Sequence, residues 1–278
     1  MMLFRPFDEA GPPTIAAMEQ ALALDPAQSG ALAVKALMTQ LLEYDWETAG
    51  RLYHLAAASS EGQYAAPAFA LFYLQFIDQQ RQAIELVATA EKLDPLHAGI
   101  KANLASILFW AGDDHAAIQK AREAFQLDPQ HLVAIEYLIR GYTNINDSAA
   151  LASLIDSIPP ALRAVAEIKS IVATNYATWG DEARARKIYE ELVASSNSLT
   201  PYAMITTAVL AISLDEIDGG IKLMERLETT GSWLQFWIKL QHMNNNTVRE
   251  NPRYQALLKR IGLDDESVAT LNERISFE

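Results

Sequence analysis

The sequence predicts an all-α fold, a solenoid of about six helix pairs with capping helices at its ends. Three observations lead to this prediction. Small and apolar residues recur every 34 residues, the tripeptide Leu-Asp-Pro recurs on nearly the same period, and apolar residues between these marks are spaced as on one face of a helix. Because one helix pair cannot bury both of its faces, successive pairs must stack.

Three series of positions carry the period. Their members are Ala49, Ala83, Ala117, Leu151, Ala185 and Gly220 in the first series; Ala56, Ala90, Ala124, Ile158, Leu192 and Leu227 in the second; and Leu37, Leu71, Ala105, Ile139, Ala173 and Ala208 in the third. Successive members lie 34 residues apart, and the last step is 35. Many are small, and small side chains at a crossing let helix axes approach to about 8–10 Å. We therefore expect helices to meet at these positions.

Proline and glycine predict where the helices end. Leu-Asp-Pro ends at Pro26, Pro95 and Pro129. A residue before proline is pushed out of the α region, so each tripeptide should end a helix. Gly112 supplies the backbone freedom that a tight turn between two helices requires.

The N-terminal segment should add half a pair. Gly11-Pro12-Pro13-Thr14 precedes a helix that we expect to begin near Pro13, which suits a first turn, and to run to about Leu24. Residues 1–12 would then form an extended cover, or the chain would be a piece of a longer array.

The C-terminal segment should cap the array. Trp233 and Trp237 are expected to cover the last helix pair. Residues 254–261 should form a short final helix, because Gly262 is suited to a position just past a helix end.

A period of 34 residues is the length of the tetratricopeptide repeat, and the sequence resembles that family. The segment 98–131 resembles it most, with Leu104, Ala105, Gly112 and Ala117 at matching positions. The resemblance implies a right-handed superhelix of about six helix-hairpin repeats plus terminal capping helices.

This resemblance covers roughly residues 14–232 and sets the expected organisation. An N-terminal cover and half-repeat helix occupies 1–29, the repeat array 30–232, and the C-terminal capping helices 233–278. The expected repeats are 30–63, 64–97, 98–131, 132–165, 166–200 and 201–232.

A narrower resemblance points to bacterial regulators. Tyr44-Asp45-Trp46 opens a second helix, and the tail 251–263 is similar to the cap of the C-terminal repeat arrays of winged-helix transcriptional regulators and adenylate cyclases. The sequence has no output domain of either kind. This resemblance therefore implies a sensor module that acts in trans on another chain.

Composition excludes several classes of protein. The 278 residues include no cysteine, which excludes disulfides, thiolate zinc sites and a cysteine nucleophile. The net charge of −13 argues against direct nucleic-acid binding, because phosphate contacts need a basic surface. We find no run of about 18 apolar residues and no secretory signal, so we expect a cytoplasmic protein without membrane contact.

No catalytic motif is found. The five histidines include no metal-binding spacing, and Gly219-Gly220 lacks the lysine of a phosphate-binding loop. Asp113-Asp114 and Asp264-Asp265 should cap helix starts rather than act as paired acids. We therefore expect no enzyme activity, no cofactor and no metal.

The candidate binding surface is the concave groove. The resemblance implies that the first helix of each repeat lines it. The expected groove residues are Met38, Leu41, Phe72, Gln75, Phe76, Lys101, Asn103, Ser106, Phe109, Trp110, Glu136, Arg140 and Asn144. Aromatic side chains and arginine are frequent anchors of interfaces. A clamp for a terminal carboxylate is disfavoured, because basic residues near Asn103 are sparse.

Four further aromatic residues are expected in the core. They are Trp46, Tyr53, Trp179 and Tyr189, which fall at consensus positions of the repeat.

These observations favour a non-catalytic scaffold that binds a protein or peptide partner in its groove. The alternative is the regulatory module acting in trans, and a small-ligand or catalytic pocket in the groove is the third interpretation. The partner's identity stays open, and so does a homo-oligomer. The acidic charge suits a basic partner or serves solubility.

Overall fold

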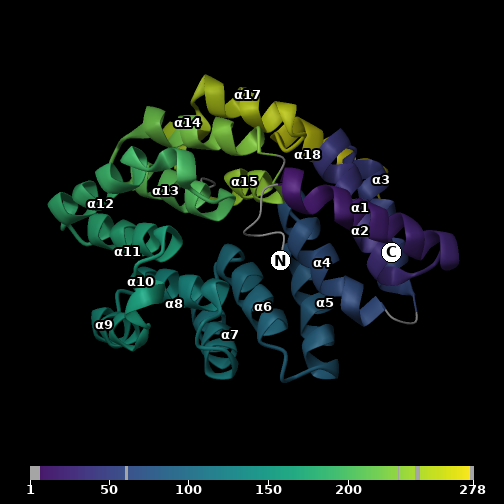
Figure 1. The fold of residues 1–278 in the computed structure, drawn as a ribbon, viewed down its shortest axis with the longest axis horizontal. Helices are drawn as coiled ribbons and strands as arrows, with labels where there is room; N and C mark the ends of the chain where they lie inside the picture. The colour runs from purple at the N-terminus through teal and green to yellow at the C-terminus, as the bar shows by residue number, and fades with distance from the viewer. Residues whose placement is uncertain (1–6, 60–61, 231, 242–244, 276–278) are drawn as a thin grey trace. The chain divides into compact units, whose positions relative to one another are not determined.

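The computed structural model describes residues 7–59, 62–230, 232–241 and 245–275. Within these ranges the chain forms helices and turns with no strand, which confirms the predicted all-α class (Figure 1). The chain divides into two compact units. Unit 1 contains 1–93 and 227–278, and unit 2 contains 94–226.

Unit 2 is a continuous run of helix pairs. Its helices are α6 (Ala98–Trp110), α7 (Asp114–Leu127), α8 (Leu132–Asn144), α9 (Ser148–Ser157), α10 (Pro160–Arg163), α11 (Ala166–Thr178), α12 (Glu182–Ala194), η2 (Ser196–Ser198), α13 (Pro201–Ser213) and most of α14 (Ile217–Glu228). The first helices of successive pairs contact one another in the order α6, α8, α11 and α13, as Figure 1 shows. The pairs therefore stack as the sequence predicts.

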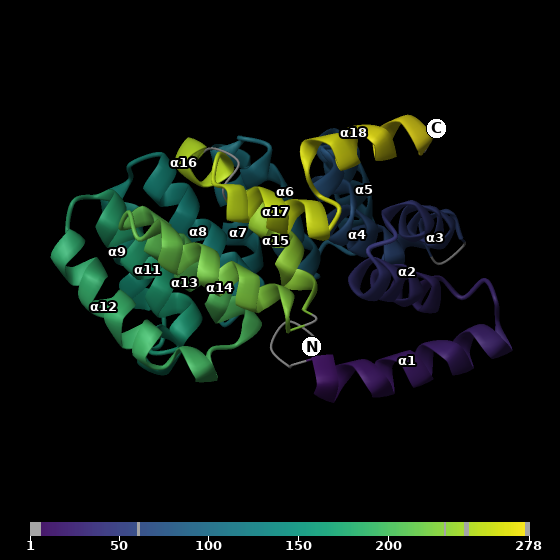
Figure 2. The same cartoon turned by 90° about the horizontal axis from the view of Figure 1, so that it is seen from above.

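The first part of unit 1 contains two further pairs and a preceding helix. The elements are α1 (Phe7–Leu24), α2 (Ser29–Glu43), α3 (Trp46–Ala58), α4 (Gly62–Phe72), η1 (Leu74–Ile77) and α5 (Gln80–Leu93). Figure 2 shows α1 as an outer helix whose neighbour is α2. Helix α2 also contacts α3 and α4, so it has the same neighbours as a first helix of unit 2.

The second part of unit 1 comes from the C-terminal end of the chain. Its elements are η3 (Trp233–Phe236), α15 (Trp237–Gln241), α16 (Asn246–Arg249), α17 (Pro252–Arg260) and α18 (Asp265–Arg274). Helix α18 contacts α3 and η1, and α15 contacts η1. Unit 1 is thus assembled from two segments that are far apart in the sequence.

The periodic positions lie in the core. All members of the three 34-residue series are buried. At Gly220 an added Cβ would lie 2.8 Å from a side-chain carbon of Ile212. The prediction that helices meet at these positions is confirmed, and Gly219-Gly220 belongs to helix packing rather than to a phosphate-binding loop.

The turn inside each pair uses a left-handed residue. Six of the seven described positions with positive φ follow the same period, with φ between 53° and 89°: Tyr44, Asp78, Gly112, Asn146, Gly180 and Asp215. Sequence reasoning identified the need for such a residue only at Gly112. Aspartate and asparagine tolerate this conformation better than most side chains, whereas tyrosine does so rarely.

The predicted helix ends are confirmed at the Leu-Asp-Pro tripeptides. Helices α1, α5 and α7 end at Leu24, Leu93 and Leu127. The predicted start of the first helix is wrong, because α1 begins at Phe7 and includes Pro12 and Pro13. Residues 7–11 form one further turn before the prolines. Pro12 and Pro13 have no backbone N–H, so they cannot donate to the carbonyls of this turn.

Two expectations about the tail and the core are also wrong. The helix ending at Arg260 is not final, because α18 follows after Gly262. Asp264 accepts a hydrogen bond from the backbone N–H of Ser267 and so starts this new helix. Trp179 is 37% exposed rather than core, because it follows the last residue of α11 and directly precedes the turn at Gly180.

Candidate functional site

The structure separates the expected groove residues by exposure. Met38, Leu41, Gln75, Phe76, Lys101, Ser106 and Glu136 are buried, whereas Phe72, Asn103, Phe109, Trp110, Arg140 and Asn144 are partly or fully exposed. Five of the six exposed residues lie on α6 and α8 of unit 2. We call Asn103, Phe109, Trp110, Arg140 and Asn144 the α6–α8 patch.

Two aromatic side chains at the end of α6 form the apolar part of this patch. Phe109 and Trp110 meet edge to face with ring centroids 5.0 Å apart. The indole Nε1 of Trp110 donates a hydrogen bond of 2.9 Å to the hydroxyl of Tyr137 on α8. The centroids of the Phe109 and Tyr137 rings lie 5.3 Å apart. The buried Tyr137 therefore fixes both rings while part of each stays exposed.

The polar part of the patch is fixed by a buried carboxylate. Arg140 Nε lies 2.7 Å from Oε1 of Glu136, which is fully buried. The hydroxyl of Tyr202 on α13 donates to the other oxygen of Glu136. Burial raises the pKa of Glu136, and the Arg140 guanidinium opposes this effect. Glu136 thus links α8 to α13 and sets the orientation of Arg140.

The remaining polar groups have partners within unit 2. Asn144 Nδ2 donates to Oδ1 of Asp114 over 3.1 Å. Lys101 Nζ lies 2.8 Å from Oε2 of Glu123 and is buried. Since both Lys101 and Arg140 already pair with carboxylates, neither is placed as a cation of a terminal-carboxylate clamp.

The expected groove residues of unit 1 belong mostly to its core. Phe76 is fully buried and packs edge to face on Trp46 and on Phe236. Gln40, which was not singled out in the sequence, donates through Nε2 to the carbonyl of Phe72 over 2.9 Å. Phe72 is the one expected groove residue of unit 1 whose described side chain is partly exposed.

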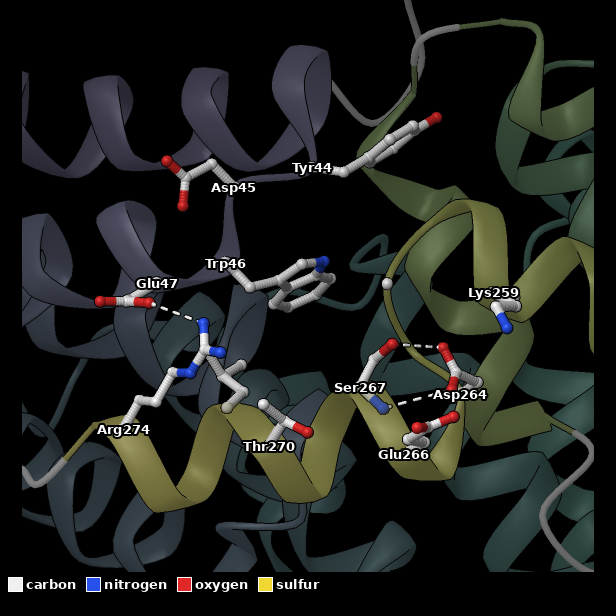
Figure 3. Close-up of a pocket in the computed structure, with 12 residues that line it drawn as sticks. Tyr44, Asp45, Trp46, Glu47, Lys259, Asp264, Glu266, Ser267, Thr270 and Arg274 are labelled. Atoms are coloured by element: carbon white, nitrogen blue, oxygen red, sulfur yellow. Dashed lines mark hydrogen bonds and ion pairs between the residues drawn. The ribbon is translucent and has the colours of Figure 1, made fainter.

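Unit 1 has a separate hollow beside Trp46, with a volume of about 520 Å³. Figure 3 shows residues 44–47 on one side and α18 with the end of α17 on the other. Its lining is Tyr44, Asp45, Trp46, Glu47, Lys259, Gly262, Asp264, Glu266, Ser267, Thr270, Leu271 and Arg274. This hollow was not expected from the sequence, although it is lined by Tyr44-Asp45-Trp46, which the resemblance to bacterial regulators singled out.

Most charges of this hollow are used locally. Asp45 accepts from the Thr48 N–H, which lowers the pKa of Asp45. Burial raises the pKa of Asp264, but hydrogen bonds from Ser267 outweigh it and lower that pKa. Glu47 pairs with Arg274 over 3.6 Å. These contacts, drawn in part in Figure 3, are those of a junction between helices.

The histidines at 97 and 131 serve the backbone. His97 Nδ1 accepts from the N–H of Ile100 over 3.2 Å, and His131 Nδ1 accepts from the N–H of Ala134 over 3.4 Å. Each histidine precedes a first helix and caps it. Within the described ranges we find no group of three histidine, aspartate or glutamate side chains that could hold a metal ion. None of the described helices is long and apolar enough to cross a bilayer.

Comparison with known proteins identifies the fold. No family model and no curated protein matches the sequence. Among solved structures, the chain is similar to pilF of Pseudomonas aeruginosa, with a TM-score of 0.51 and 18% identity over 85% of this chain and 98% of that one. It is also similar to the Cut9–Hcn1 assembly of the APC/C, with a TM-score of 0.53 and 12% identity over 94% of this chain and 51% of that one.

A tetratricopeptide repeat protein from Parabacteroides merdae matches 87% of this chain and 98% of its own, with a TM-score of 0.48 and 13% identity. At identities this low, a likeness concerns the fold alone. The matches to pilF and Cut9 confirm the predicted fold, which is all-α and of the tetratricopeptide-repeat kind.

Proposed function

We propose that this chain is a non-catalytic scaffold that binds a protein or peptide partner through the α6–α8 patch. The observation that carries the proposal is the partly exposed aromatic pair Phe109 and Trp110, held in place by Tyr137. An aromatic side chain that is fixed before binding loses little entropy on binding, and aromatic residues are common anchors of interfaces.

The polar residues beside this pair complement it. Asn103 and Asn144 supply amide groups, and Arg140 presents a guanidinium whose orientation is set by Glu136. A peptide segment with an apolar residue and neighbouring polar groups matches this set. Basic residues elsewhere on the partner would suit the net charge of −13.

The test is capture of partners from the native lysate with the intact chain as bait. Trp110→Ala and Arg140→Ala should each lose the captured protein, because one removes the anchor and the other the oriented cation. Trp179→Ala is the matched control, since Trp179 is exposed but lies outside the patch. Capture that persists in both patch variants would contradict the proposal.

A regulatory module acting in trans is the second candidate. It is favoured by Tyr44-Asp45-Trp46, which receives the C-terminal helices in unit 1 through contacts to Gln235 and Ile261. Such a module needs an output domain on another chain, and it would act in the cytoplasm. Association with an orphan output protein encoded nearby, measured by co-purification, would support this candidate, and its failure would count against it.

A further inference from the structure

Three helix pairs share one pattern of contacts with the helix that follows them. A first helix contacts its own second helix and the next first helix, and that second helix also contacts the next first helix. The triangles α2–α3–α4, α6–α7–α8 and α11–α12–α13 all follow it. In each of these triangles, the second helix and the next first helix form a groove that the preceding first helix occupies.

Helix α1 has the sequence of a second helix. It ends in Leu-Asp-Pro at Pro26, as α7 does at Pro129, so the two helices align with an offset of 103 residues. Helix α1 also contacts the first helix that follows it, α2, as α7 contacts α8. By this pattern, α1 and α2 together should form a groove for a first helix.

The face of α1 that would meet this first helix is known from the alignment. In α7 the residues Ala117, Ala121 and Ala124 are fully buried. The residues of α1 at the same positions are Thr14, Met18 and Ala21, and all three are only partly buried. Leu24, which corresponds to Leu127, is 89% exposed.

The structure has a groove at this face, with a volume of about 770 Å³. Its lining is Pro13, Thr14, Ala17, Met18, Ala21, Leu24, Asp25, Gln28, Gly30, Ala31 and Val34. The lining is mostly apolar and largely small. No helix among the described residues is in substantial contact with α1 other than α2.

We propose that this α1–α2 groove binds an amphipathic helix of a partner protein, with basic residues flanking its apolar face. The helix length follows from α6, α8, α11 and α13, which have 13 residues each. Because alanine and glycine line much of the groove, the partner supplies the large aliphatic side chains. The complex reproduces the α6–α7–α8 triangle with a helix from another chain.

Charge selects this partner over a second copy of the chain. Asp25 lines the groove, Glu19 is exposed on α1, and residues 7–24 contain no lysine or arginine. Helix α1 of a second copy would bring the same acidic charge, and the groove would repel it. Basic flanks on a partner helix are attracted to it instead.

The probe for this proposal is a labelled peptide with the sequence of residues 98–110, since α6 occupies the equivalent groove. One form carries two lysines at each end, and its matched form carries two glutamates. Fluorescence anisotropy with the full chain should show saturable binding of the lysine form and much weaker binding of the glutamate form. High salt should reduce that difference.

Two neighbouring alanines on α1 provide the blocking variant and its control. Ala17 lines the groove and Ala16 does not, while both are exposed, so either can accept a larger side chain without changing the core. Ala17→Trp should weaken binding by about tenfold or more, since a blocked groove costs over 1 kcal/mol. Ala16→Trp should leave binding unchanged. Circular dichroism confirms that both variants remain folded.

Three results would overturn the proposal: no saturable binding of the lysine form, equal weakening by both variants, or equal binding of the glutamate form. A dimer in sedimentation that Ala17→Trp dissociates would assign the groove to a second copy instead. The Trp110→Ala variant separates this proposal from the scaffold function. It should bind the peptide normally, whatever it does to partner capture.

Discussion

The indole Nε1 of Trp46 donates a hydrogen bond of 2.8 Å to the backbone carbonyl of Ile261, which is 215 residues away in the sequence. The same indole packs on Phe236 with ring centroids 5.0 Å apart. Lys239 Nζ makes a comparable bond of 2.7 Å to the carbonyl of Phe76. The C-terminal helices are thus held to the first repeats by side chains that bond to backbone carbonyls.

Trp46→Phe tests the contribution of the indole hydrogen bond. Phenylalanine keeps most of the packing but leaves the buried carbonyl of Ile261 without its donor. An unsatisfied buried acceptor costs about 1–3 kcal/mol, so the free energy of unfolding should fall by that amount in urea titrations. Trp179→Phe is the control, because Trp179 is exposed and should tolerate the change. Equal effects of the two substitutions would contradict the assigned role of Trp46.

Gly112→Ala tests the left-handed turns. The φ of Gly112 is 85°, and an added Cβ would meet no atom within 4 Å, so the effect comes from the backbone alone. An L-residue in this conformation costs about 1–2 kcal/mol, which should appear as a lower free energy of unfolding. Asn146→Gly, at the same position of the next pair, should leave stability unchanged or raise it slightly.

Gly262→Ala should be more damaging than Gly112→Ala. The φ of Gly262 is also positive, at 71°, but here an added Cβ would lie 3.0 Å from Nε1 and Cδ1 of Trp46. The substitution therefore adds a steric clash to the backbone cost, and it should also disturb the bond to Ile261. Thermal unfolding of both variants provides the comparison, and a smaller loss at Gly262 would show that the Trp46 junction adapts freely.

Glu136→Gln tests the buried carboxylate through pH. Burial raises the folded-state pKa of Glu136. A raised carboxyl pKa adds stability below the unfolded value of about 4.3, and this contribution is lost as the pH rises through the folded pKa. Glutamine does not titrate, so the variant should gain stability relative to the wild type as the pH increases across that window. Urea unfolding of both proteins at several pH values would reveal this gain. A difference in their free energies of unfolding that stays constant with pH would argue against the titration of Glu136.

The sequence predicted the helices better than the binding surface. The 34-residue period located the buried positions, because a position where two helices cross needs a small residue. Ala117 and Ala185 are two such positions. It could not show that Asp78 and Asn146 adopt the left-handed conformation, because several residue types tolerate it. Tyr44 gave no such signal at all, since tyrosine is rarely found there.

The groove prediction assigned residues to a helix face but could not give their exposure. Phe76 and Phe109 were grouped together, yet Phe76 is buried by Phe236 from the C-terminal segment. That contact depends on residues 160 positions away, which a local repeat pattern does not encode. Glu136 was expected to face a partner, but it is covered because its oxygens bind Arg140 and Tyr202.

Site-specific photo-crosslinking tests the scaffold function most directly. A benzophenone amino acid would replace Asn103 or Asn144 in the α6–α8 patch, or Lys187, which is exposed on a second helix. Illumination in the native lysate should join the same partner protein to positions 103 and 144 and leave position 187 without a product. A partner that crosslinks at 187 but at neither patch position would contradict binding through the α6–α8 patch.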